Sequence, residues 1–269
     1  MSSSQAARPD LATVAAIGVL AYVLSIAAHE ALGHGITALA LGAPVRHLTN
    51  VDLEADTLRL SAWQMRLFSA SGCAANIAVG AGALAWLRRG RGDGAARYFA
   101  WLLGHVSLFM AGGSPLALSF ASSGDWHDFA EGLPALLAVK LLLTAAGAAL
   151  SLWTFQHCRR TLGEFTGSTQ PVRKRRATAL TLAPYLAGSL TNSLASVLNP
   201  INPQLILMSA AAWTFGGTFW LVLAGALPGR VTADMPQNPT VPGLSRTFRG
   251  LGIAALLFLF LVLAPGFLR

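Results

Sequence analysis

Seven apolar segments, each long enough to cross a bilayer, alternate along the chain with short polar stretches. They cover about residues 11–41, 63–87, 98–121, 133–157, 178–198, 204–227 and 250–268. Because about 20 apolar residues cross the hydrocarbon core, this pattern predicts an all-α polytopic membrane protein with about seven transmembrane helices. The first segment is too long for one upright span, so we expect it to tilt or break.

One stretch outside these segments has a different period. Between Val45 and Leu60, apolar and polar residues alternate on both sides of Asn50-Val51-Asp52. Alternation with a turn in the middle predicts a short β-hairpin after the first helix. We expect the hairpin's acids, Asp52, Glu54 and Asp56, to be solvated.

Composition supports the membrane assignment. Hydrophobic residues make up 54% of the 269 residues and charged residues 11%, whereas soluble domains carry roughly 25% charge. The two cysteines, Cys73 and Cys158, provide neither a disulfide framework nor a cysteine metal site. The net charge of +8 comes from residues between the spans, so we expect membrane topology rather than nucleic acid to explain it.

Basic residues also indicate an orientation. If residues 1–10 form a cytoplasmic tail, fourteen of the 19 Lys and Arg residues fall on that side and four on the other. The positive-inside rule therefore predicts a cytoplasmic N-terminus, in what we expect to be a bacterial cytoplasmic membrane. The cluster Arg173–Arg176 is expected to be a topology anchor first and a contact for anionic lipids second.

The first segment contains His29, Glu30 and His34, and Glu30 is the only acid inside any apolar segment. An ionisable side chain within a membrane span marks a functional site by default. Two imidazoles beside one glutamate form the inventory of a zinc hydrolase, with histidines on the metal and the glutamate on the attacking water.

The spacing of these residues is H-E-x-x-x-H rather than H-E-x-x-H. On a regular α-helix, His29 and His34 would point about 140° apart. One metal can bind both only if the helix carries an extra residue in a turn, a π-bulge, which Gly33 and Gly35 would make easier. The alternative is that Glu30 and His34, four residues apart, share a face and ligate together.

A zinc site of this kind requires a third protein ligand. The loop from Ser122 to Phe129 offers Asp125, His127 and Asp128 and contains no Lys or Arg. Asp125 is favoured because Gly124 gives the turn freedom to present it, and His127 is the next candidate. We expect His105, in the third segment, to serve packing or proton relay rather than ligation, and Asn76 to hydrogen-bond across a helix interface.

These residues resemble a known family. HEALGHG is similar to the H-E-x-G-H signature of the site-2 protease family of intramembrane zinc metalloproteases, and SASGCAAN is similar to its G-x-x-x-N segment. The resemblance covers about residues 11–130. It implies that His29, His34 and Asp125 bind Zn²⁺, that Glu30 is the general base, and that Asn76 lies near the site. Residues 11–132 would form the metalloprotease-like core and residues 133–269 a set of accessory transmembrane helices.

The leading hypothesis is an intramembrane zinc metallopeptidase that hydrolyses a membrane-embedded or membrane-adjacent peptide bond. Its partners would be the lipid bilayer and a membrane-protein or peptide substrate, with no nucleic acid. The alternative is a catalytically inactive, protease-like binding protein or chaperone, which the unusual histidine spacing favours. A di-iron oxygenase is excluded because the six histidines are scattered, and the lack of internal repeats disfavours an inverted-repeat transporter.

Overall fold

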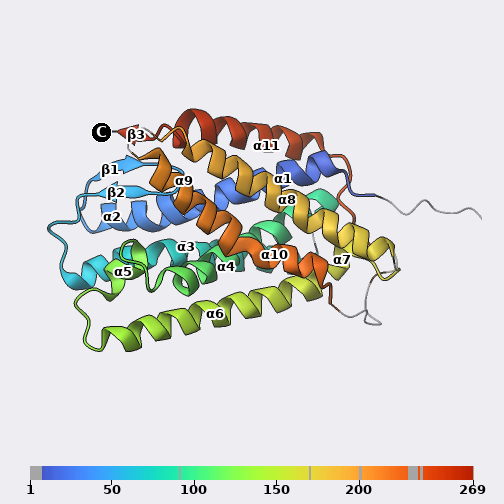
Figure 1. Ribbon diagram of the computed structural model, residues 1–269. Helices are drawn as coiled ribbons and strands as arrows, with labels where there is room; N and C mark the ends of the chain where they lie inside the picture. The colour runs from blue at the N-terminus through green and yellow to red at the C-terminus, as the bar shows by residue number, and fades with distance from the viewer. Residues whose placement is uncertain are drawn as a thin grey trace, which may run out of the picture.

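The computed structural model describes residues 8–90, 92–169, 171–199, 202–229, 236 and 239–268. Residues 1–7 of the predicted tail lie outside this part of the chain, as do Arg91 and Arg230, which contribute to the charge count above. Within it the protein is an all-α polytopic membrane protein with one small sheet, as predicted (Figure 1).

The helices run side by side along one long bundle (Figure 1). Three consecutive elements form the first, continuous helix: α1 (Leu11–Ala27), the π-helix η1 (Ala28–Gly35) and α2 (Ile36–Ala40). The others are α3 (Ala62–Arg88), α4 (Gly94–Leu118), α5 (Asp125–Ala130), α6 (Leu136–Thr161), α7 (Gly163–Thr166), α8 (Val172–Ser196), α9 (Pro203–Ala211), the π-helix η2 (Ala212–Gly216), α10 (Gly217–Ala226), α11 (Arg246–Phe258) and the π-helix η3 (Leu259–Leu263).

The predicted count of seven membrane spans is wrong by one. Within the described residues, six helices are long and apolar enough to cross a membrane. The stretch 178–198, expected to be the fifth span, lies mostly in α8, which at 25 residues is as long as α4 but too polar to qualify. Its first turn is basic, and its buried positions include Thr181, Ser189 and Asn192, which lower its hydropathy while packing inside the bundle.

The predicted hairpin is confirmed. Strand β1 (Val45–Leu48) pairs antiparallel with β2 (Leu53–Ala55), and β3 (Phe267–Leu268) adds to the other edge of β1. Its turn is fastened to α8, because the Asn50 side-chain amide donates to Asn192 Oδ1 at 2.9 Å and to Ser196 Oγ at 2.8 Å. These hydrogen bonds hold the sheet against α8, at the end of the bundle away from the start of α1 (Figure 1).

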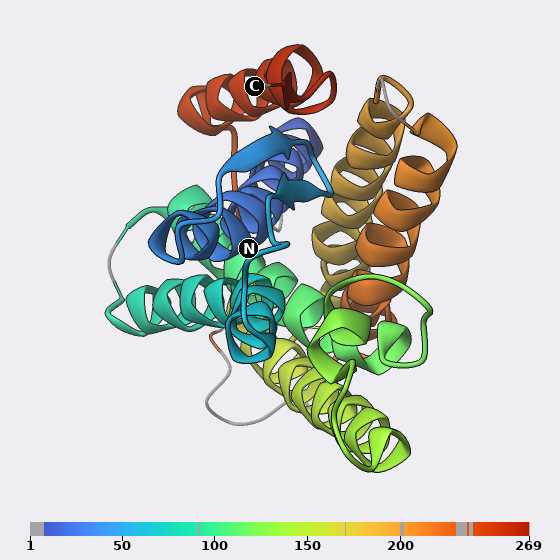
Figure 2. The same cartoon turned by 90° about the vertical axis from the view of Figure 1, so that its left-hand side faces the viewer.

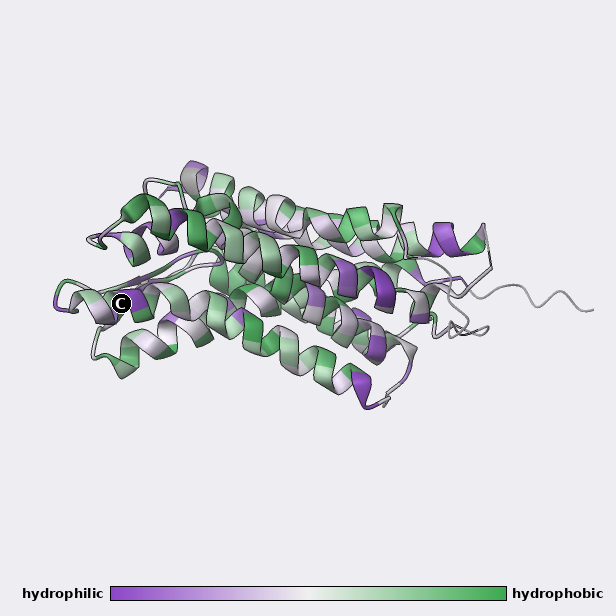
Figure 3. Cartoon of the chain, turned by 90° about the horizontal axis from the view of Figure 1, so that it is seen from below, coloured by the Kyte–Doolittle hydropathy of each residue, from purple (hydrophilic) through white to green (hydrophobic). Residues whose placement is uncertain are grey.

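Helix α1 lies at the centre of the bundle and packs against α4, α8 and α11 (Figure 2). Its Ile17, Ala21, Tyr22 and Ile26 are fully buried, which fits a helix that is apolar on all sides. Hydrophilic residues are frequent near the end of the bundle where α1 begins (Figure 3). The long first helix thus carries the motif through the protein core to the opposite end.

Candidate metal centre

The motif lies in a π-helix. Residues Ala28–Gly35 depart from the α-helical geometry on either side, so the distortion that the five-residue spacing requires is present. The rings of His29 and His34 face each other edge-on, with centroids 4.9 Å apart. Both imidazoles are buried, with 4% of each residue exposed. The π-helix therefore places the two histidines on one face.

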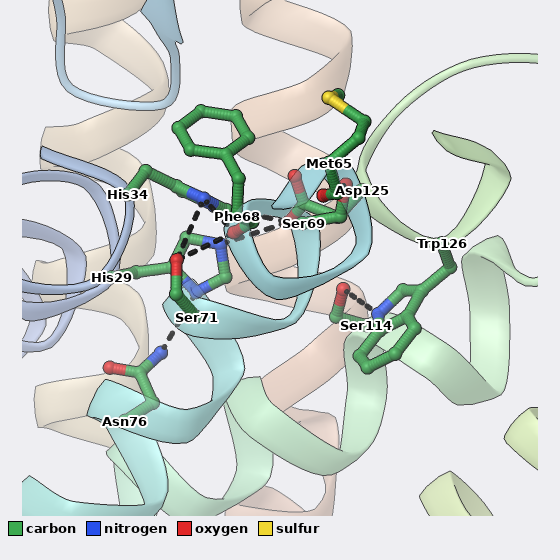
Figure 4. Close-up of polar contacts among 10 residues, drawn as sticks. All are labelled: His29, His34, Met65, Phe68, Ser69, Ser71, Asn76, Ser114, Asp125 and Trp126. Atoms are coloured by element: carbon green, nitrogen blue, oxygen red, sulfur yellow. Dashed lines mark hydrogen bonds and ion pairs between the residues drawn. The ribbon is translucent and has the colours of Figure 1, made fainter. Parts of the chain in front are cut away.

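Asp125 completes a group of three (Figure 4). It is the first residue of α5 and follows Gly124, whose φ of 93° favours glycine. Its Oδ2 lies 3.2 Å from His29 Nε2 and 3.3 Å from His34 Nε2. Glu30, the alternative partner for His34 as a ligand, is not part of this group.

The distances suit zinc. Tetrahedral Zn²⁺ with bonds of about 2.0–2.2 Å sets neighbouring ligand atoms roughly 3.3–3.5 Å apart. The two distances from Asp125 Oδ2 approach that spacing, and candidate atoms of all three residues lie within 4.8 Å of one another. Two imidazoles and one carboxylate also match a catalytic zinc site with one open position. The residues present therefore fit the ion.

The electrostatics of Asp125 favour ligation. Burial alone would raise the pKa of its carboxyl, but hydrogen bonds with His29 and His34, and their proximity, hold the pKa well below its usual range. The carboxylate is thus in the ionised form that a metal binds, and the histidine Nε2 atoms that hydrogen-bond to it must lose their protons before they can ligate. The other candidates in this loop, His127 and Asp128, group instead with Glu131 at a separate and more exposed place.

Neighbouring polar groups orient the histidines. His34 Nδ1 donates to the Phe68 carbonyl at 3.0 Å, so Nε2, which faces Asp125, is the atom available to a metal. Ser71 Oγ donates to the same carbonyl at 2.6 Å. The side-chain amide of Asn76 lies 3.5 Å from His29 Nδ1, and Asn76 Oδ1 is buried without a partner among the described residues. A half-turn of that amide lets Oδ1 accept from His29 Nδ1, the support that a ligating histidine usually has.

Helix α3 approaches η1 very closely because two glycines face each other. A Cβ on Gly33 would lie 2.5 Å from Gly72 Cα, and a Cβ on Gly72 would lie 2.5 Å from His29 Nε2. The small-residue segment of α3 therefore makes room for the His29 ring as well as for helix packing.

We expect Gly72→Ala to weaken zinc binding by at least about 10–100-fold, the usual cost of disturbing a ligand's support. The added methyl group would overlap the His29 ring. Gly82→Ala in the same helix is the control, because a Cβ there meets no atom within 4 Å. A competition titration with a zinc-binding dye measures both, and equal affinities would contradict this packing.

Deletion of Leu32 should preserve the site. Leu32 is 54% exposed and lies within the π-helix, so removing it turns H-E-A-L-G-H into H-E-A-G-H. In a regular α-helix the two histidines would then be four residues apart on one face. We expect the zinc affinity to change by less than roughly tenfold, as for the length-preserving control Leu32→Ala. If the deletion variant lost zinc and Leu32→Ala kept it, the site would require the π-helix, and this prediction would be wrong.

The three ligand candidates open onto a cavity of about 650 Å³, which Glu30 also lines. Glu30 is 4% exposed, and no described residue hydrogen-bonds its carboxylate. Elsewhere the walls are mainly apolar or small residues from α4, the loop before α5, α9 and η2. Glu30 is thus a buried carboxylate beside the ligand group.

Sequence reasoning missed two parts of this site. Trp213, in η2, packs its ring against His29, with the ring centroids 4.6 Å apart. The sequence gives no sign of this contact, because an aromatic residue is ordinary in an apolar span. Asp52 is exposed, as expected of a hairpin acid, but it also lines the cavity. The cavity is therefore lined by residues from both the predicted core, 11–132, and the predicted accessory helices, 133–269. The boundary between these two parts stays a prediction.

His105 lies elsewhere. It is fully buried and does not line the cavity. Its Nε2 is 3.0 Å from His157 Nδ1, and its Nδ1 donates to the Trp101 carbonyl at 2.7 Å. The structure thus gives His105 a packing environment rather than a place in the ligand group.

Comparison of the chain with protein-family models, with curated proteins and with solved structures found no match. The resemblance to site-2 proteases accordingly stays a prediction from the motifs.

Proposed function

We propose that this protein is an intramembrane zinc metallopeptidase. The observation that carries the proposal is the convergence of His29 Nε2, His34 Nε2 and Asp125 Oδ2 beside the buried Glu30 carboxylate. Two imidazoles, a carboxylate ligand and a separate carboxylate base are what zinc-assisted hydrolysis needs.

The residues divide the work. Zinc bound by His29, His34 and Asp125 would supply Lewis-acid polarisation and lower the pKa of a bound water. Glu30 accepts the proton of the attacking water and returns it to the leaving amine. The apolar walls limit competing water, which strengthens the electrostatic interactions within the cavity.

The depth of the site bears on its substrate. His29 follows Leu11 by 18 residues, or about 27 Å along the helix, in a hydrocarbon core about 30 Å thick. The site would therefore lie near the membrane boundary opposite the start of α1. We propose a peptide bond at or close to that boundary as the substrate, with the N-terminus of the protein in the cytoplasm.

The proposal is tested with protein reconstituted in liposomes and loaded with zinc. The probe is a mixture of synthetic peptides with apolar stretches of about 20 residues flanked by lysines, and mass spectrometry reads new termini. We expect cleavage that 1,10-phenanthroline abolishes and added zinc restores. A zinc-bound protein that cleaves none of the peptides would favour the alternative of an inactive binding protein. The unusual histidine spacing no longer supports that alternative, because the π-helix brings both histidines to one face.

A further inference from the structure

The basic cluster at the start of α8 divides into two pairs. Arg173 and Arg176 are 3% and 8% exposed and turn inward. Arg173 donates to the Gly229 carbonyl, and Arg176 to the Thr166 carbonyl at 3.1 Å. Lys174 and Arg175, between them, are exposed. Only the inward pair is therefore used to hold the fold together.

The outward pair lies at one end of a groove of about 650 Å³. The groove follows one stripe of α8, with Ala179, Leu182 and Leu186 in line, and Leu11 of α1 borders it. Apart from Lys174 and Arg175 its lining residues are uncharged, and none of them is acidic. It is thus an open apolar groove with two positive charges at one end.

The dimensions of the groove match one leaflet. The lining extends from Pro171, the residue before α8, to Leu186, which corresponds to about 22 Å along the helix axis. Half of a bilayer, headgroups included, is about 20–22 Å thick. With Lys174 and Arg175 at headgroup depth, Leu186 reaches close to the middle of the bilayer.

We propose that this groove is a binding site for one anionic phospholipid. The phosphate contacts Lys174 and Arg175 near the N-terminus of α8, where the helix dipole also favours negative charge. An acyl chain follows Leu182 and Leu186 and covers the outer stripe of a helix that is too polar to span a membrane by itself. The site lies apart from the proposed zinc centre and does not depend on it.

The test measures lipid affinity of the detergent-purified full chain by native mass spectrometry. The probes are phosphatidylglycerol and phosphatidylcholine with the same acyl chains. We expect Lys174→Gln/Arg175→Gln to weaken phosphatidylglycerol binding about 30-fold, given the contribution of each of the two basic residues at a membrane surface. The affinity for phosphatidylcholine should be unchanged.

Arg88→Gln/Arg89→Gln is the matched control, because it removes two exposed charges outside the groove. It should leave phosphatidylglycerol binding intact. Leu186→Trp, which places a bulky ring in the groove, should weaken both lipids. Equal losses in the two charge variants, or displacement of phosphatidylglycerol by equimolar inorganic phosphate, would overturn the proposal.

Discussion

Glu30→Gln should lower the rate of peptide hydrolysis by about 10²–10⁴-fold, the usual contribution of a general base. Glutamine has almost the same shape but cannot accept the proton of the attacking water. The three ligand candidates remain in place, so the variant should still bind one zinc per chain. A loss of rate without a loss of metal separates a proton-transfer role from a structural one.

The measurement is the cleavage rate of the peptide mixture in liposomes, together with zinc content. Glu54→Gln is the control, because Glu54 is an exposed acid on the hairpin and does not line the cavity. It should leave the rate unchanged. A Glu30→Gln variant that cleaves like the wild type would remove Glu30 from the mechanism.

Asp125→Ala should reduce zinc affinity by more than the roughly 10–100-fold that loss of a supporting group costs, because a direct ligand is removed. Its Oδ2 is within 3.3 Å of both histidines. His127→Ala and Asp128→Ala, which alter the same short helix, should keep wild-type affinity because their side chains belong to the separate group with Glu131.

Competition with a zinc-binding dye compares the three variants under identical conditions. Circular dichroism confirms that each keeps its helical content. If His127→Ala released zinc and Asp125→Ala did not, the loop would present a different ligand from the one in the structure.

Local patterns predicted much of this protein. The length of the apolar segments identified the helices, and the alternation around Asn50-Val51-Asp52 identified the hairpin. Both signals lie within one continuous segment of the chain. The five-residue spacing of His29 and His34 required a π-bulge if one metal was to bind both. That distortion is found at the motif, and Gly124 does present Asp125 to the two histidines.

What the sequence could not supply depends on contacts between distant segments. Trp213 reaches His29 across 184 residues, and no local pattern encodes that meeting. Asp52 is an exposed turn residue, as its place in the hairpin predicts, but it reaches the cavity only because Asn50 holds the hairpin against α8. The side chains of Thr181 and Ser189 are buried inside the bundle. Their burial explains why α8 packs there although it is too polar to qualify as a membrane span.

The central claim is that His29, His34 and Asp125 form a zinc site, and the most direct test is the metal content of the detergent-purified protein. Wild-type protein and His34→Ala would be analysed side by side by mass spectrometry of the metal. We predict about one zinc per wild-type chain and almost none in the variant, since three protein ligands are needed to hold a catalytic zinc. A folded wild type without stoichiometric metal after incubation with zinc would contradict the account.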